Sequence, residues 1–288
     1  MSDTQVNLTG VIQQAAVRLR AAGIDAAEAE AEIILCHLLL TERLQMYLEG
    51  ANKITPEILA KFEAIVTKRE TRYPLQFILG EQYFYGRRFF VNESVMIPTP
   101  ETELLCENAV RYLNLIDTDA PAVLEIGTGA GVIAVTVALE APQVRMTALD
   151  ISADALEVAR KNASDLGASD ITFRESDLFS ALEVGERFDL VLSNPPYIAD
   201  GEYDGLPPEV KADPRIALTS GERGLDIIKR LIAEAPKHLK PGGKFMFEIG
   251  YDQAEWIAEI VEADERYRSH VLQKDLNDID RLFILSVY

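Results

Sequence analysis

The chain has 288 residues, which suits one large or two modest domains, and its apolar content of 48% is ample for a packed core. A formal net charge of −19 argues against a protein that binds a nucleic-acid duplex through a basic surface. No apolar run could span a bilayer, the start of the chain has no signal-peptide pattern, and Cys36 and Cys106 are isolated, so we expect a soluble cytoplasmic protein.

The first part of the chain has the apolar spacing of a helical bundle. The spacing predicts helices over residues 8–22 and 44–48, and between them a helix that Asp25 caps and that runs to Leu40. A stronger start signal is Thr55-Pro56-Glu57, which combines an N-cap hydroxyl, a proline at the first helical position and an acid. We predict a small helical domain over residues 1–72.

Residues 73–97 are rich in aromatic side chains and are broken by Gly80 and Gly86, a composition typical of a β-hairpin or short strands. We predict that this hairpin links the helical domain to a third segment, residues 98–288. Pro98-Thr99-Pro100-Glu101 reads as another helix start, with Thr99 as its N-cap.

Strand-like and helix-like segments alternate from residue 122 onward. The expected strands are 123–126, 144–149, 171–175, 188–192, 243–249, 268–272 and 281–286, and the expected helices are 132–140, 153–166, 224–238 and 254–262. This alternation predicts an α/β fold with a doubly wound, mostly parallel sheet. The last two strands read as an antiparallel hairpin at one edge.

A glycine-rich loop at the first strand–helix junction indicates a cofactor site. Glycines in Gly127-Thr128-Gly129-Ala130-Gly131 let the backbone turn tightly and approach a ligand, and Asp150 at the next strand end can accept ribose hydroxyls. The Gly-x-Gly-x-Gly spacing differs from the nicotinamide and flavin fingerprint. Glu125, which precedes the first glycine, suits a cationic ligand such as S-adenosylmethionine better than a pyrophosphate.

The ends of the third and fourth strands add further groups. Asp177 can accept from an adenine amino group while Leu178 and Phe179 pack on the ring, although Ser176-Asp177 equally suits a capped turn. Asn194-Pro195-Pro196-Tyr197 predicts a stiff loop that presents carbonyl acceptors, an amide and an aromatic face to a planar –NH2 group. Because ligands bind beyond the carboxyl ends of such strands, the combination predicts a Rossmann-like methyltransferase.

Several motifs together resemble the peptide chain release factor glutamine N5-methyltransferases (the PrmC/HemK family) over nearly the whole length. They lie at residues 74–80, 97–104, 125–131, 193–198, 214–218, 224–226 and 240–243. The resemblance implies a seven-stranded S-adenosylmethionine-dependent methyltransferase domain, with S-adenosylhomocysteine as product. It also implies the Gly-Gly-Gln glutamine of release factors as substrate, an effect on translation termination, and an N-terminal domain that docks the factor. One departure is Thr99, where the family commonly has arginine.

The motifs and the resemblance together predict a defined set of site residues. Asn194, Pro195 and Tyr197 are expected to be catalytic, and together with Pro196 they are expected to bind the substrate. The expected cofactor-binding residues are Glu125, Gly127, Thr128, Gly129, Ala130, Gly131, Asp150, Ile151, Asp177, Leu178 and Asn194. We expect no metal site, no direct nucleic-acid or membrane binding, and a monomer. The rival interpretations are an adenine-N6 nucleic-acid methyltransferase, a nicotinamide-dependent dehydrogenase and a non-catalytic binding module.

Overall fold

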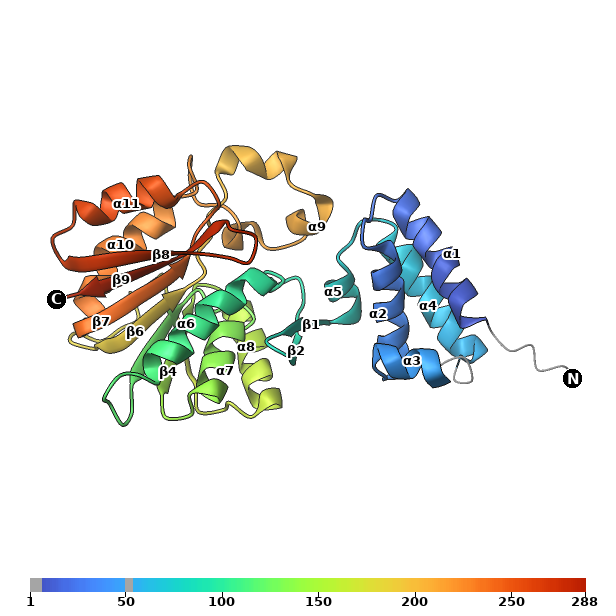
Figure 1. Cartoon of the computed structure of the whole chain (residues 1–288), viewed down its shortest axis with the longest axis horizontal. Coiled ribbons are helices and arrows are strands. Elements are labelled where there is room, and N and C mark those ends of the chain that lie inside the picture. The colour runs from blue at the N-terminus through green and yellow to red at the C-terminus, as the bar shows by residue number, and fades with distance from the viewer. Residues whose placement is uncertain (1–6, 50–53) are drawn as a thin grey trace, which may run out of the picture. The chain divides into compact units, whose positions relative to one another are not determined.

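The computed structural model describes residues 7–49 and 54–288, and the chain divides into two compact units. The first unit contains Met1–Gly80 and Pro207–Ala212, and the second contains Glu81–Leu206 and Asp213–Tyr288 (Figure 1). In the described ranges, no helix has both the length and the apolar character needed to cross a membrane.

The first unit is a helical bundle, as predicted. Its helices are α1 (Leu8–Ala21), α2 (Ala27–Leu39), α3 (Arg43–Glu49), α4 (Pro56–Arg69) and α5 (Leu75–Leu79). Their apolar faces share one core, in which Ile34 and Phe62 are fully buried. Thr55 caps α4, because its hydroxyl accepts a hydrogen bond from the Ile58 N–H at 3.3 Å. The predicted cap at Asp25 is wrong, since α2 begins after Ala26 and has no side-chain cap.

The helical unit extends beyond residue 72, its predicted end. Leu75, in α5, is buried in the same core, and the unit runs through Gly80. Within the predicted linker, the hairpin consists of β1 (Glu81–Phe84) and β2 (Arg87–Phe90), which pair antiparallel and belong to the second unit. The buried rings of Phe84 and Phe89 meet edge to face, with 6.1 Å between their centroids.

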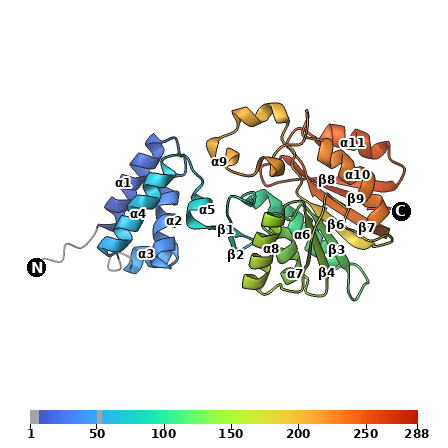
Figure 2. The same cartoon turned by 180° about the vertical axis from the view of Figure 1, so that it is seen from behind.

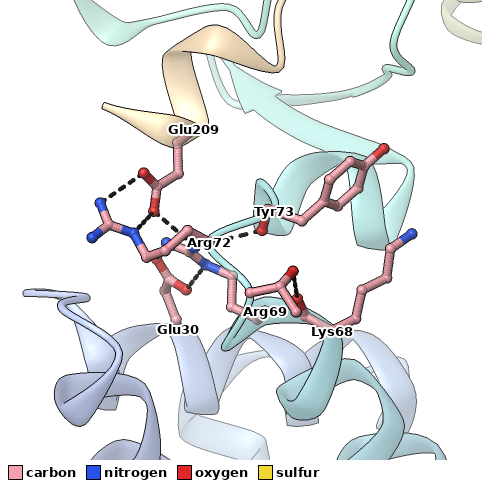
Figure 3. A network of polar contacts seen from close by, with 7 residues as sticks. Glu30, Lys68, Arg69, Arg72, Tyr73 and Glu209 are labelled. Atoms are coloured by element: carbon pink, nitrogen blue, oxygen red, sulfur yellow. Dashed lines mark hydrogen bonds and ion pairs between the residues drawn. The ribbon is translucent and has the colours of Figure 1, made fainter. Parts of the chain in front are cut away.

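The helical unit also binds a segment from much later in the chain, the short helix α9 (Pro208–Lys211). Figure 3 shows Glu209 of α9 between two arginines: Arg69 Nη1 donates to it at 2.8 Å and Arg72 Nη2 at 2.7 Å. Arg69 is 5% exposed and also donates to Glu30 at 2.7 Å. A guanidinium that is buried to this degree needs carboxylate partners, so Glu209 is an integral part of this unit.

We expect Glu209→Gln to lower the free energy of unfolding by about 1–3 kcal/mol, because Arg69 keeps only one carboxylate partner. Partial burial of Glu209 acts to raise its pKa, but the hydrogen bonds from Arg72 and Arg69 lower it from 4.5 to about 2. A carboxylate whose pKa is lowered by folding stabilises the fold at pH values above its ordinary pKa. This stabilisation is lost as the pH falls through the lowered pKa. The difference in the free energy of unfolding between wild type and Glu209→Gln should therefore shrink as the pH falls from 4.5 towards about 2.

Urea unfolding of the full chain, followed by circular dichroism, measures this difference. The exposed Glu202, on the same loop, provides a matched control as Glu202→Gln. The single tryptophan, Trp256, lies in α11 (Ala254–Glu262) of the second unit, so its fluorescence reports that unit separately. Equal stability of Glu209→Gln and wild type at neutral pH would refute a structural role for the arginine contacts.

The second unit contains the predicted seven-stranded sheet, in the order β5-β4-β3-β6-β7-β9-β8. The strands are β3 (Ala122–Ile126), β4 (Arg145–Asp150), β5 (Thr172–Glu175), β6 (Phe188–Ser193), β7 (Leu239–Glu248), β8 (Tyr267–Lys274) and β9 (Asp280–Val287). The first five are parallel, whereas β9 runs antiparallel to both β7 and β8. The predicted antiparallel edge is therefore confirmed.

Helices cover both faces of this sheet (Figures 1 and 2). They are α6 (Glu103–Leu113), α7 (Val132–Glu140), α8 (Ala153–Leu166), α10 (Asp226–His238) and α11. The core beneath α10 and α11 includes the stacked rings of Phe245, Phe247 and Phe283. The one-turn 3-10 helix η2 (Pro100–Thr102) precedes α6, and Thr99 occupies its N-cap position without the predicted side-chain bond.

The strand order places the predicted site. From β3 the chain moves outward through β4 to β5 and then returns to β6 on the other side of β3. The pairing of β3 with β6 sets Ile126 opposite Ser193, and the Ser193 hydroxyl donates to the Ile126 carbonyl at 2.9 Å. The glycine loop and the Asn194 loop therefore leave the sheet side by side at the topological switch point, where open α/β sheets bind ligands.

Candidate active site

A pocket lies at the carboxyl ends of β3, β4 and β6, and all of its lining residues belong to the second unit. It collects most of the predicted cofactor residues together with Asn194. The predicted residues that line it are Glu125, Gly127, Thr128, Gly129, Ala130, Asp150, Asn194 and Pro196. The loops after β3, β4 and β6, which are far apart in the sequence, thus contribute to one concave site, as predicted from the strand ends.

The glycine loop leaves room for a ligand. Gly127 and Gly129 have φ values of +74° and +52°, in the left-handed region that glycine tolerates best, and no heavy atom lies within 4 Å of where a Cβ would stand. Gly131 is different, because a Cβ there would approach Ala159 of α8 at 3.1 Å. The first two glycines therefore keep the pocket open, and the third allows α7 and α8 to pack closely.

Glu125 lines the pocket, and one of its two carboxylate oxygens has no hydrogen-bond partner. One oxygen, Oε2, accepts from the Thr128 hydroxyl at 2.7 Å and from the Ala134 N–H at 3.0 Å. The other, Oε1, is buried and has no hydrogen-bond partner. Complete burial raises the pKa of Glu125 to about 8. Since a buried carboxylate requires a compensating charge or donor, Glu125 is suited to a cationic group of a ligand.

Asp150 is held rigidly at the end of β4. Its Oδ2 accepts from the Gly129 N–H at 2.8 Å and its Oδ1 from the Ser152 N–H at 2.9 Å, and burial raises its pKa. Each of these oxygens retains a further lone pair. Asp150 can therefore still accept hydrogen bonds from hydroxyl groups in the pocket that it lines.

The remaining predicted cofactor residues lie outside the lining of this pocket. Ile151 is half exposed, and Leu178, with φ of +51°, packs beside the core of the sheet. Asp177 is exposed, and its Oδ1 accepts from Arg230 of α10 at 2.9 Å. This ion pair joins residues 53 apart in sequence and was not predicted.

The Asn194 loop is fixed from several directions. The Asn194 side-chain amide donates through Nδ2 to the Thr102 hydroxyl at 3.0 Å, and Gln253 Nε2 donates to the Tyr197 carbonyl at 2.9 Å. Burial raises the pKa of the Tyr197 hydroxyl, which donates to Glu248 at 3.4 Å. No hydrogen bond to Asn194 Oδ1 is found in the described part of the chain. The loop therefore presents a free amide oxygen on a constrained backbone.

Several residues of the site were not predicted. Thr102 and the segment that includes Ser94, Val95 and Met96 line the pocket, as do Ile216 and Ala217. Glu248 was missed too, although it is the last residue of β7 and therefore lies, like the predicted site residues, at the carboxyl end of a parallel strand. Within residues 7–49 and 54–288, no group of His, Cys, Asp or Glu side chains is arranged to hold a metal ion.

Comparison with known proteins decides the family. The PrmC N-terminal domain matches residues 11–80, and a methyltransferase domain matches residues 117–283. The release factor glutamine methyltransferase of Cereibacter sphaeroides is 43% identical over 273 residues, covering 94% of this chain and 95% of that protein. The protein of the same name from Koribacter versatilis is 39% identical over 97% of this chain and 98% of its own length. The chain belongs to the release factor glutamine methyltransferase family.

Solved structures show how widely the fold of this family member is shared. The hMettl16 catalytic domain, in complex with MAT2A 3′UTR hairpin 1, has a TM-score of 0.55 at 15% identity and covers 81% of this chain and 82% of its own. The 16S rRNA methyltransferase RsmC of T. thermophilus, in complex with AdoMet and guanosine, has a TM-score of 0.52 at 17% identity, over 72% of this chain and 50% of that one. At these identities the likeness concerns the fold alone.

Proposed function

We propose that this chain transfers a methyl group from S-adenosylmethionine to the side-chain amide nitrogen of the glutamine in the Gly-Gly-Gln loop of release factors. The observation that carries the proposal is the placement of Asn194, with its free amide oxygen, in a glycine-loop pocket that is also lined by Glu125, one of whose carboxylate oxygens has no hydrogen-bond partner. An amide acceptor next to a site for a cationic cofactor is what methylation of a planar –NH2 group requires.

The pocket residues fit S-adenosylmethionine. Glu125 Oε1 lacks a hydrogen-bond partner, which suits the ammonium and sulfonium charges of the cofactor. The open space above Gly127 and Gly129 admits the part of the cofactor that would lie against the loop backbone. Asp150 would accept the ribose hydroxyls. When bound, the cofactor supplies a methyl group made electrophilic by its sulfonium. The surrounding Thr128, Ala130 and Gly131 complete the turn that holds it.

We assign the adenine end of the cofactor to Asp177, Leu178 and Ile151. Asp177 Oδ1 is engaged by Arg230, whereas no bond to its Oδ2 is found in the described part of the chain. That oxygen can accept from an exocyclic amino group. The assignment extends the ligand from the pocket along the ends of β4 and β5.

Chemistry at the amide depends on placement, because a glutamine nitrogen is a poor nucleophile whose lone pair is delocalised. The Asn194 Oδ1 and the Pro195 carbonyl accept the two amide hydrogens and direct the nitrogen towards the methyl carbon, while the Tyr197 ring packs on the amide plane. The bound cofactor would supply the methyl group, and the surplus amide proton would leave to the Pro195 carbonyl or to water. Correct placement can contribute about 7–11 kcal/mol in favourable cases. Pro196, which lines the pocket, keeps this loop stiff.

The helical unit would dock the release factor. Large apolar side chains are exposed along α2, the turn after it and α3: Ile33, Leu40, Leu44, Tyr47 and Leu48. Leu44 and Leu48 are one turn apart and so share a face of α3. We propose that the chain acts as a monomer. The net charge of −19 favours a partner with a basic face and disfavours a nucleic-acid substrate.

A methyl-transfer assay tests the proposal. The purified chain is incubated with labelled S-adenosylmethionine and a release factor, either wild type or with its Gly-Gly-Gln glutamine replaced by alanine. We expect label on the wild-type factor only, and mass spectrometry should locate it on that glutamine. Label on added RNA or DNA, with none on the factor, would overturn the proposal in favour of a base methyltransferase.

A further inference from the structure

A buried chain of hydrogen bonds runs from Glu248 through Thr102 to Asn194. The Thr102 hydroxyl donates to Glu248 Oε2 at 2.7 Å and accepts from Asn194 Nδ2 at 3.0 Å. Both Thr102 and Glu248 are almost completely buried, with 2% and 1% exposure. Three separate elements supply these groups: η2, the end of β7 and the loop after β6. Pairing of β6 with β7 sets Ser193 opposite Phe247, which brings Asn194 and Glu248 to adjacent strand ends.

We propose that Glu248 and Thr102 are positioning residues that fix the orientation of the Asn194 amide, an inference that rests on the proposed contact between Asn194 and the substrate. The Glu248 carboxylate sets the direction of the hydrogen bonds in this chain. It only accepts hydrogen bonds when ionised, so it determines which way the hydroxyl hydrogen of Thr102 points.

The direction of each bond follows from the number of hydrogens available. The Thr102 hydroxyl has one hydrogen, and once this is given to Glu248 its oxygen can only accept. The Asn194 amide must therefore turn its NH2 group towards Thr102. Its Oδ1 then faces away from Thr102, free to accept a substrate N–H. In the flipped amide, Oδ1 would face the lone pairs of Thr102, and the NH2 group would meet the N–H bonds of the substrate.

The same carboxylate holds a second part of the loop. Glu248 Oε1 accepts from the Tyr197 hydroxyl at 3.4 Å, so one buried group orients both the amide and the aromatic ring proposed to contact the substrate. Loss of the charge on Glu248 would disturb the orientation of both the amide and the ring. This arrangement explains a buried acid at a site where the proposed reaction uses no general base.

Protonation of Glu248 would remove the constraint. The protonated carboxyl could donate to Thr102, whose hydrogen would then be free to turn towards Asn194. Burial raises the pKa of Glu248 to about 7 and Glu101 on η2 adds to the rise, whereas bonds from Thr102 and Tyr197 and the charge of Arg281 on β9 act against it. The pKa of the buried Cys106 thiol on α6 is raised by its burial and by nearby carboxylates that include Glu248. Turnover should therefore fall as the pH decreases through about 7.

Steady-state kinetics of the full chain with a release factor test this inference, with cofactor affinity from calorimetry as a separate readout. Thr102→Val preserves shape but removes the hydroxyl, and we expect kcat to fall by about 10- to 100-fold, a much larger effect than any change in cofactor affinity. Thr102→Ser restores the hydroxyl and should restore kcat. Glu248→Gln cannot ionise and should abolish the decline of kcat on the acidic side. If Thr102→Val does not fold, Glu248→Gln decides the matter.

A reference variant separates this inference from the proposed function. If Asn194→Ala retains turnover, the proposed role of Asn194 fails, and the positioning role fails with it. If Asn194→Ala is inactive while Thr102→Val has wild-type kcat, or Glu248→Gln keeps the acidic decline, only the positioning role fails. In the Asn194→Ala background, Thr102→Val should cause no further loss of residual activity.

Discussion

Replacing Asn194 with alanine is expected to lower kcat for transfer to the release factor by about 10²- to 10³-fold, the range found when a single preorganised hydrogen-bonding group is removed from an active site. The variant loses the amide oxygen that accepts a substrate hydrogen. Affinity for S-adenosylmethionine should stay close to that of wild type, because Glu125, Asp150 and the glycine loop are untouched. Transfer of labelled methyl groups, together with calorimetric titration of the cofactor, measures the two effects separately.

Asn114→Ala provides the matched control. Asn114 is an exposed residue at the end of α6, so its replacement should leave both kcat and cofactor affinity unchanged. Near-normal turnover by Asn194→Ala would show that the amide oxygen does not bind the substrate. The site would then have to place the glutamine nitrogen through backbone carbonyls alone.

Gly224→Ala is expected to cost about 10²-fold in kcat although Gly224 lies outside the pocket lining. A Cβ at this position would stand 1.9 Å from the Tyr197 carbonyl oxygen and 2.9 Å from Gln253 Nε2, and φ is +67°. The added methyl group must therefore displace the backbone of the Asn194 loop or the glutamine that holds it. Such overpacking also destabilises the fold, by about 1–3 kcal/mol.

A second glycine separates the clash from backbone strain. Gly185 has a φ of +88°, and a Cβ at this position would have no heavy atom within 4 Å, so Gly185→Ala carries only the left-handed penalty of about 1–2 kcal/mol. We expect its kcat to match wild type. Thermal unfolding and kinetics of both variants should be compared. Wild-type kcat in Gly224→Ala would mean that the position of Tyr197 does not limit transfer.

Much of the fold could be predicted because its signals are local. The expected helices over 132–140, 153–166 and 254–262 coincide with α7, α8 and α11, and all seven expected strands are present. Apolar periodicity and glycine turns reflect the conformations of neighbouring residues, so they can be recognised without knowledge of the rest of the chain. The glycine loop and Asn194 were placed together because parallel strands end at a common edge.

Helix caps were less reliable. Asp25 and Thr99 have side chains typical of N-caps, yet neither forms the expected bond, whereas Thr55 does. One cap bond contributes only about 1 kcal/mol, so packing can override it. At the start of α2, Ala27 and Ala31 are fully buried, and this packing rather than a cap sets where the helix begins.

The amino-acid order alone specifies the seven strands of the sheet, the helices between them, the family and the loops that bear the site. Tertiary structure alone decided which partners those loops have. Thr102 meets Asn194 across 92 residues and Glu248 across 146, and Arg69 meets Glu209 across 140. Such pairs depend on which strands are neighbours and on which charges lose contact with water. Both are properties of the assembled fold, because a buried polar group must find its partner wherever the packing places one.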